Sequence, residues 1–133
     1  MRAADTTEKV TREHPELLRP YKKELLGLLA QTEEQKLRWH LAAMAPRLPL
    51  SGRERELVMK SLQLYLEDRS SIVKTLALQA LADLAADDQD LREQVFAILQ
   101  QAESCGTAAM KARSRKLLAK FESASEQNYR GLP

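Results

Sequence analysis

Apolar residues recur with helical spacing through most of the chain, most clearly in the stretch IVKTLALQALADLA at residues 72–85. Its apolar stripe consists of Val73, Ala77, Ala80, Leu81 and Leu84, at offsets 0, 4, 7, 8 and 11. Side chains at these offsets lie on one face of a helix with about 3.6 residues per turn. The stretch therefore predicts a helix with one buried face, on which the small alanines allow a neighbouring helix to approach closely.

The same offsets recur upstream and downstream of this stretch. Upstream they hold Leu37, Leu41, Met44, Ala45 and Leu48, and downstream they hold Met110, Ser114, Leu117, Leu118 and Phe121. The three copies start at residues 37, 73 and 110, so they are 36 and 37 residues apart. A leucine lies eleven residues before each start, at Leu26, Leu62 and Leu99. The pattern therefore predicts three consecutive pairs of helices.

Residues typical of helix ends separate these segments. Capping-box spacing is found at Thr32–Gln35, Ser51–Glu54 and Asp90–Glu93. Ser70 or Ser71, and Thr107, are expected N-cap residues. Gly106 is expected to follow a helix in the left-handed conformation. Pro15 suits a first helical turn, whereas Pro20 and Pro46 predict a kink, a restart or an end. The predicted hairpins span about residues 14–49, 50–87 and 88–123. Residues 1–13 and 124–133 carry no stripe, so we expect tails there.

The pattern of Val73–Lys74, Ala77, Ala80–Leu81 and Leu84 resembles the second helix of a HEAT repeat, and the resemblance covers about residues 15–122. The spacing is shorter than the ~40–47 residues usual for that class. Leu41 and Ser114 stand in the outer copies where a small alanine is expected, and terminal repeats often depart from a pattern. The resemblance implies an all-α fold, a right-handed α-α superhelix of three HEAT-like hairpins with about six helices. Tetratricopeptide repeats, the competing class, would need a spacing of about 34 residues and a Trp–Leu–Gly–Tyr pattern that this sequence lacks.

Composition narrows the classes of protein that fit. The 133 residues suffice for one domain, and the formal net charge of +2 does not by itself favour nucleic acid or an anionic membrane. The single cysteine excludes an intrachain disulfide and fits a reducing compartment. The first twelve residues lack the apolar stretch of a secretory signal, and no apolar run approaches the ~18 residues of a membrane span. We therefore expect a soluble, cytoplasmic protein that does not enter a membrane.

No motif of an enzyme or of a metal site is found. The sequence contains no glycine-rich phosphate loop and no HExxH, CxxC or GxSxG motif. His14 and His40 lack a third ligand, and Cys105 is expected near a helix C-terminus, which does not activate a thiol. The acidic group Asp83, Asp87, Asp88 and Asp90 does not fit the calcium loop of an EF-hand. We therefore predict no catalytic residue, no metal and no cofactor.

A basic residue follows the start of each copy, and we call Arg38, Lys74 and Lys111 the basic ladder. By the HEAT resemblance, the second helices line a concave face, where the ladder would meet an acidic partner; alternatively, it bonds neighbouring repeats to each other. Residues 111–120 hold five basic residues and no acid, which predicts a basic surface on the last helix. The candidate partner-binding residues are Arg38, Trp39, Lys74, Gln79, Lys111, Arg115 and Lys116.

These features favour a non-catalytic module or adaptor that binds a protein or peptide on the concave face. The alternative is DNA or RNA binding through the basic ladder and the last helix, since some alkylpurine DNA glycosylases have HEAT-like folds. A subunit of a larger enzyme, as in HEAT-like chromophore lyases, is a third hypothesis. Self-association through open ends of the array is a fourth, with apolar edges expected at Leu17, Leu18, Leu117 and Phe121.

Overall fold

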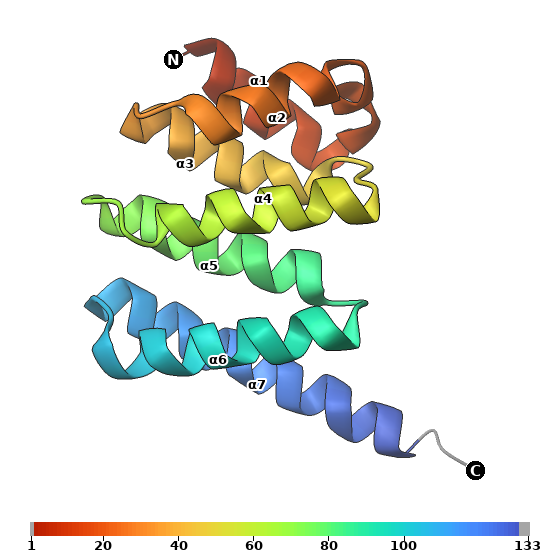
Figure 1. Cartoon of the computed structure of the whole chain (residues 1–133), viewed down its shortest axis with the longest axis vertical. Coiled ribbons are helices and arrows are strands. Elements are labelled where there is room, and N and C mark those ends of the chain that lie inside the picture. Colours follow the sequence, from red (N-terminus) through yellow and green to blue (C-terminus); the bar gives the residue numbers. More distant parts are fainter. Residues whose placement is uncertain (1, 131–133) are drawn as a thin grey trace.

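The computed structural model describes the backbone of residues 2–130 and the side chains of residues 2–124 (Figure 1). This part of the chain is all-helical, as predicted. It contains α1 (Arg2–Glu13), α2 (Lys22–Gln31), α3 (Gln35–Met44), α4 (Gly52–Tyr65), α5 (Ser71–Ala85), α6 (Gln89–Cys105) and α7 (Ala108–Arg130). Two 3-10 segments, η1 (Pro15–Tyr21) and η2 (Ala45–Arg47), precede α2 and follow α3. The prediction of about six helices is wrong by one.

The additional helix is α1, which occupies the segment for which a tail was predicted. It packs against α3 and η1, at the N-terminal end of the molecule (Figure 1). Its buried side chains are those of Glu8 and Thr11, which are polar. The prediction failed because it looked for an apolar stripe, and this helix is held by polar contacts instead.

The helices pack in the order in which the chain runs. α3 packs against α5 and α5 against α7, whereas α2 packs on α3 and α4, and α6 packs on α5 and α7. α5 lies at the centre, in contact with α3, α4, α6 and α7, and α1 and α7 lie at opposite ends of the stack (Figure 1). Its predicted stripe is buried throughout, from Val73 at 1% exposure to Leu84 at 8%. This central helix therefore fixes the positions of the helices on either side.

Several predicted helix starts are confirmed. Ser51 and Glu54 form the capping box of α4, with Glu54 N donating to Ser51 Oγ and Ser51 N donating to Glu54 Oε1. Ser70 caps α5 by accepting from Val73 N, and Thr107 accepts from Met110 N at the start of α7. Pro46 lies in η2, directly after α3 ends, as its missing amide donor predicts.

Other predicted ends are wrong. α3 begins after Glu34 without a side-chain cap, so Thr32 is not its N-cap. Asp88, two residues before the expected Asp90, caps α6 by accepting from the amides of Asp90 and Leu91. Gly106 has an extended backbone (φ −80°, ψ 178°) and not a left-handed one. A glycine is needed there because a Cβ would lie 2.5 Å from Ala102 O and 2.8 Å from Met110 Cβ.

The last helix extends beyond the predicted boundary at residue 123. α7 continues to Arg130, so most of the predicted tail at 124–133 is helical, and residues 131–133 lie outside the described range. Residue 1 of the predicted N-terminal tail also lies outside it. Among the described helices, none combines the length and the apolar character that crossing a membrane requires.

Candidate interaction surface

The seven predicted partner-binding residues lie on three helices that pack in succession. The set is distributed as Arg38 and Trp39 on α3, Lys74 and Gln79 on α5, and Lys111, Arg115 and Lys116 on α7. Since α5 separates α3 from α7, the structure brings the set together as three neighbouring groups. The members differ in whether other groups of the protein contact them.

Arg38 is held by contacts within the protein. Its Nη1 donates to Asp68 Oδ2 at 2.9 Å, and its Nε donates to Thr32 O at 2.8 Å. The guanidinium also lies over the ring of Tyr65, with Cζ 4.8 Å from the ring centroid. Because the Asp68 side chain is only 4% exposed, the ion pair is largely shielded from water. Arg38 therefore links α3 to the segment after α4, which is the structural alternative considered for the ladder.

Tyr65 and Asp68 complete this contact, and no sequence pattern pointed to either of them. Tyr65 is the last residue of α4, and its hydroxyl donates to Leu29 O of α2 at 2.6 Å. Burial raises the pKa of the Tyr65 phenol to about 12. Asp68 Oδ1 accepts from Ser70 N at 2.8 Å, which orients the carboxylate toward Arg38. We call Arg38, Tyr65 and Asp68 the first joint, because they connect the first predicted hairpin to the second.

The second joint consists of the residues at the equivalent places one repeat later: Lys74, Ala102 and Cys105. They follow Arg38 by 36 residues and Tyr65 and Asp68 by 37, the same spacings that separate the three copies. Alanine replaces the aromatic ring and cysteine replaces the carboxylate. Within the described part of the chain, Lys74 has no acidic group within ion-pair distance. Lys74, the second residue of the basic ladder, is therefore a half-buried cation with no acidic group of the described chain in contact with it.

A groove of about 390 Å³ lies at the second joint. Its lining includes Lys74, Ala102 and Cys105. It is completed by Gln63 at the end of α4, by Leu66 and Glu67 directly after α4, and by Met110 at the start of α7. Beside it, the hydroxyls of Ser71 and Thr107 form a hydrogen bond of 2.8 Å that links the starts of α5 and α7. The groove is thus bounded by four helices and combines an apolar wall with one cation and one carboxylate.

Gln79 and the basic residues of α7 are partly used inside the protein. Gln79 Oε1 accepts from Arg113 Nη1 at 2.9 Å, and its Nε2 donates to Asp83 Oδ1 at 3.0 Å, so Gln79 joins α5 to α7. Desolvation raises the pKa of the Asp83 carboxyl, although Asp83 keeps contact with water. Arg115 Nε lies 3.6 Å from Glu103 Oε1 of α6.

Two of the predicted partner-binding residues on α7 are lysines without an acidic contact among the described side chains. In the part of the chain that the structure describes, neither Lys111 nor Lys116 forms an ion pair; Lys116 is exposed and Lys111 is half-buried. Together with Lys74 of α5, they are the charged members of the predicted site that form no ion pair with the described side chains. Trp39 is 38% exposed, and its ring stacks on His40 with the centroids 5.4 Å apart and the planes 4° from parallel.

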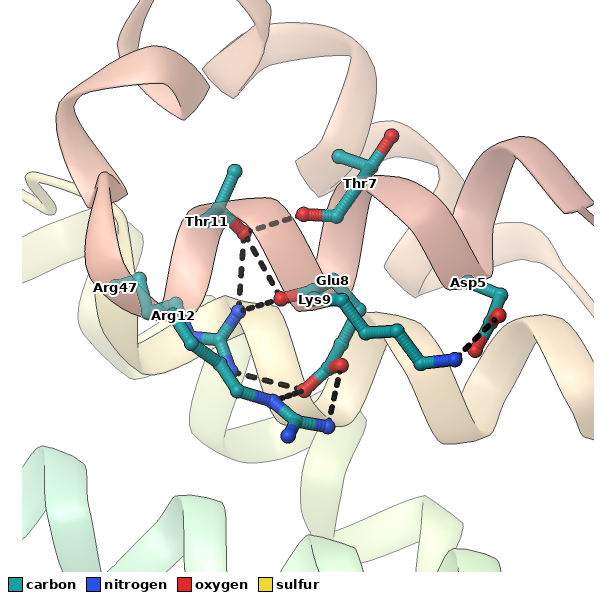
Figure 2. A network of polar contacts seen from close by, with 7 residues as sticks. All are labelled: Asp5, Thr7, Glu8, Lys9, Thr11, Arg12 and Arg47. Carbon is teal, nitrogen blue, oxygen red and sulfur yellow. Dashed lines mark hydrogen bonds and ion pairs between the residues drawn. The ribbon is translucent and has the colours of Figure 1, made fainter.

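Figure 2 shows a polar cluster that fastens α1 to the rest of the molecule. Arg47 of η2 donates to Glu8 O at 2.7 Å, to Thr11 Oγ1 at 3.0 Å and to Glu8 Oε1 at 3.0 Å. Arg12 donates to both carboxylate oxygens of Glu8, at 2.8 and 2.7 Å. The hydrogen bonds from Arg12, and then from Arg47, hold the pKa of Glu8 below its usual value despite burial. This cluster is structural, and it carried no apolar signal in the sequence.

The expected apolar edges are only partly exposed. Leu17 is 51% exposed, but Leu18 and Leu117 are buried, and the Arg92 guanidinium lies over the half-buried ring of Phe121 at 5.2 Å. α1 and η1 instead border a hollow of about 500 Å³ that includes Val10, Leu17 and Tyr21. Three further leucines are exposed: Leu28 on α2, and Leu57 and Leu64 on α4.

The described residues contain no group of three or more His, Cys, Asp or Glu side chains arranged to hold a metal ion. His14 Nδ1 lies 3.4 Å from Glu16, and His40 stacks on Trp39, so the two histidines have separate surroundings. Cys105 is exposed at the end of α6.

No family model matches the chain, and no match was found among curated proteins or solved structures.

Proposed function

We propose that this chain is a non-catalytic protein-interaction module, built as a short right-handed HEAT-like superhelix that binds an acidic protein segment. Contacts between equivalent parts of successive hairpins support the superhelix. The Tyr65–Leu29 and Ser71–Thr107 hydrogen bonds each join residues 36 apart, which is one repeat. A fold in which each hairpin contacts only the next ones leaves long surfaces for a partner.

The observation that carries the proposal is the free charge of Lys74, Lys111 and Lys116 on two adjacent helices. Other basic residues nearby, Arg38 and Arg115, have acidic groups of the protein in contact. Cations without such contacts attract an acidic partner and orient it during association. Trp39, half-exposed on α3, adds an aromatic side chain of the kind that contributes strongly to protein interfaces.

The test is affinity capture from the native cell extract with the wild type and with a Lys74→Glu/Lys111→Glu/Lys116→Glu variant. We expect specific protein partners with the wild type, and loss of those partners with the variant. Circular dichroism must show that the variant keeps its helical content. A matched control, Lys23→Glu/Lys36→Glu/Lys60→Glu, changes three exposed lysines on α2, α3 and α4 by the same charge. Equal loss in both variants would contradict the proposed surface.

Nucleic-acid binding is the second candidate, because the basic side chains of α7 include Lys111, Lys116 and Lys120 without an acid in residues 111–120. If these three lysines neutralised phosphates, log K would fall with log salt with a slope of about −2.7, at about 0.9 per contact. Mobility shifts with random duplex and single-stranded RNA at low salt test this alternative. No shift at micromolar protein excludes it.

A further inference from the structure

The first joint is filled by side chains of the protein, whereas the second joint leaves a groove. At the first joint, the Tyr65 ring stacks under the Arg38 guanidinium and the Asp68 carboxylate neutralises it. At the second, Ala102 and Cys105 are too short to provide either contact to Lys74. The groove of about 390 Å³ lies at the place of the missing side chains. The first joint therefore shows which groups fit around the cation at this position: an aromatic ring and a carboxylate.

We propose that the groove at the second joint binds a short acidic segment of a partner protein, which supplies the aromatic ring and the carboxylate that this joint lacks. The inference rests on the proposed function and specifies its site and its ligand chemistry. The carboxylate binds the ammonium group of Lys74, and the aromatic ring packs on Ala102, Leu66 and Met110. The segment therefore carries both side chains within one turn, as Tyr65 and Asp68 do.

Charge and burial both favour this ligand. Lys74 is half-buried, so a charge-assisted hydrogen bond to it is stronger than one on an open surface. The groove also contains one carboxylate, that of Glu67, which is exposed and has no ion pair in the described part of the chain. Glu67 repels an acidic ligand, and removing its charge is therefore expected to strengthen binding. A basic or neutral ligand would respond to these two residues in a different way.

The probe is a fluorescein-labelled peptide with the sequence of residues 62–70, LQLYLEDRS, because this segment supplies the ring and the carboxylate of the first joint. The control peptide has alanine in place of Tyr65 and asparagine in place of Asp68. Fluorescence anisotropy measures binding to the full chain. We expect the control peptide, and the Lys74→Gln variant with the original peptide, each to bind at least about tenfold more weakly, which corresponds to about 1.4 kcal/mol. Glu67→Gln is expected to bind the original peptide a few-fold more tightly.

Cys105 reports where the peptide binds, since it is the single cysteine, is exposed and lines the groove. Saturating peptide is expected to slow alkylation of Cys105 by iodoacetamide at least about threefold, because a bound segment covers the thiol. The Ala102→Tyr/Cys105→Asp variant fills the groove from within and is expected to lose peptide binding. If that variant does not fold, Lys74→Gln remains as the decisive comparison.

Three results would overturn the inference: no binding at millimolar peptide, equal binding of both peptides, or protection of Cys105 by a single-stranded oligonucleotide but not by the peptide. The extract experiment separates this failure from failure of the proposed function. If Lys74→Gln retains every captured partner that the triple lysine variant loses, the chain is an interaction module whose partner binds α7 and not this groove.

Discussion

The two joints differ in composition although they occupy equivalent places between successive hairpins. At the first, Arg38 has a carboxylate at 2.9 Å and an aromatic ring below it, and both partners are buried. At the second, Lys74 faces Ala102 and Cys105 across a groove. The same ladder position therefore carries an ion pair at the first joint and, among the described residues, no ion pair at the second. Periodicity identifies equivalent positions, but the neighbours at each position determine their role.

The stability of the two joints should differ accordingly. Removing a side chain from the first joint leaves a buried cavity or an unpaired charge, whereas changing Lys74 disturbs no contact that the structure shows. Tyr65→Ala and Asp68→Asn each change one member of the first joint, and each has a matched change at the second joint. The pH dependence of Tyr65 and the change at Ser114 extend the comparison. All are measured as the free energy of unfolding in urea, at neutral pH unless stated.

The largest effect is expected from Tyr65→Ala. Tyr65 is 2% exposed, packs between α2 and the Arg38 guanidinium, and donates a hydrogen bond to Leu29 O. Truncation leaves a cavity and an unpaired carbonyl, so we expect a loss of about 3–5 kcal/mol. The matched change at the second joint, Ala102→Gly, removes only a methyl group and adds backbone freedom in the helix, at about 1 kcal/mol. Losses of equal size would show that the two joints are equally packed.

Alkaline pH should weaken the first joint through the phenol of Tyr65. In the unfolded chain the phenol ionises near its ordinary pKa of about 10, and in the folded protein burial raises its pKa to about 12. Between these values the folded protein keeps a proton that the unfolded chain has lost. The contribution to stability is therefore complete below pH 10 and is lost as the pH rises through about 12, by about 2–3 kcal/mol.

The measurement for this prediction is urea unfolding of the wild type and of Tyr65→Phe between pH 9 and pH 12. The phenylalanine variant cannot ionise at this position, and the other two of the three tyrosines are present in both proteins. The difference in unfolding free energy between the two proteins should shift in favour of the variant as the pH rises. Parallel curves would mean that the phenol titrates alike in the folded and unfolded chains.

A smaller loss is expected from Asp68→Asn, which keeps the shape of the side chain but removes the charge that faces Arg38. The Arg38 side chain is 24% exposed, so water compensates for part of the lost ion pair, and we expect about 2 kcal/mol. Lys74→Gln, at the ladder position of the second joint, should stay within about 0.5 kcal/mol of the wild type. A loss of about 2 kcal/mol in Lys74→Gln would reveal an internal role for this residue.

The sequence predicted the helices whose contacts are apolar and missed the contacts that are polar. The stripes on residues 37–48, 73–84 and 110–121 identified helices because 3.6-residue periodicity places apolar residues on one face. α1 has no such stripe, because Glu8 and Thr11 are the side chains that it buries, and Arg47 holds them from η2. No local pattern connects residues 8 and 47.

The candidate site was predicted as a set of positions, and the structure separates its members by their partners. Arg38 and Lys74 look alike in the sequence, since both follow the first residue of a stripe. The difference between them lies about 30 residues later in the sequence, at the ends of α4 and α6. Asp68 follows α4, whereas Cys105 is the last residue of α6. This difference becomes visible in the sequence when the ends of the first helices of the hairpins are aligned, in addition to the apolar stripes of the second helices. The partners of Gln79 and Arg115 depended on side-chain geometry that spacing alone does not contain.

The smallest effect is expected at Ser114, which extends the comparison from the joints to the stripes themselves. Ser114 occupies the place of Ala77 in the next copy, and both are 0% exposed. Among the described side chains, the Ser114 hydroxyl is buried without a hydrogen-bond partner. A buried hydroxyl that binds nothing has lost its water and gained no contact, and alanine also has the higher helix propensity. We therefore expect Ser114→Ala to stabilise the protein by about 1 kcal/mol, with Ala77→Ser, the reverse change in α5, destabilising it. If Ser114→Ala lowered the free energy of unfolding instead, the Ser114 hydroxyl would form a hydrogen bond in solution. The third stripe would then contain a polar contact that the second stripe, with Ala77, lacks.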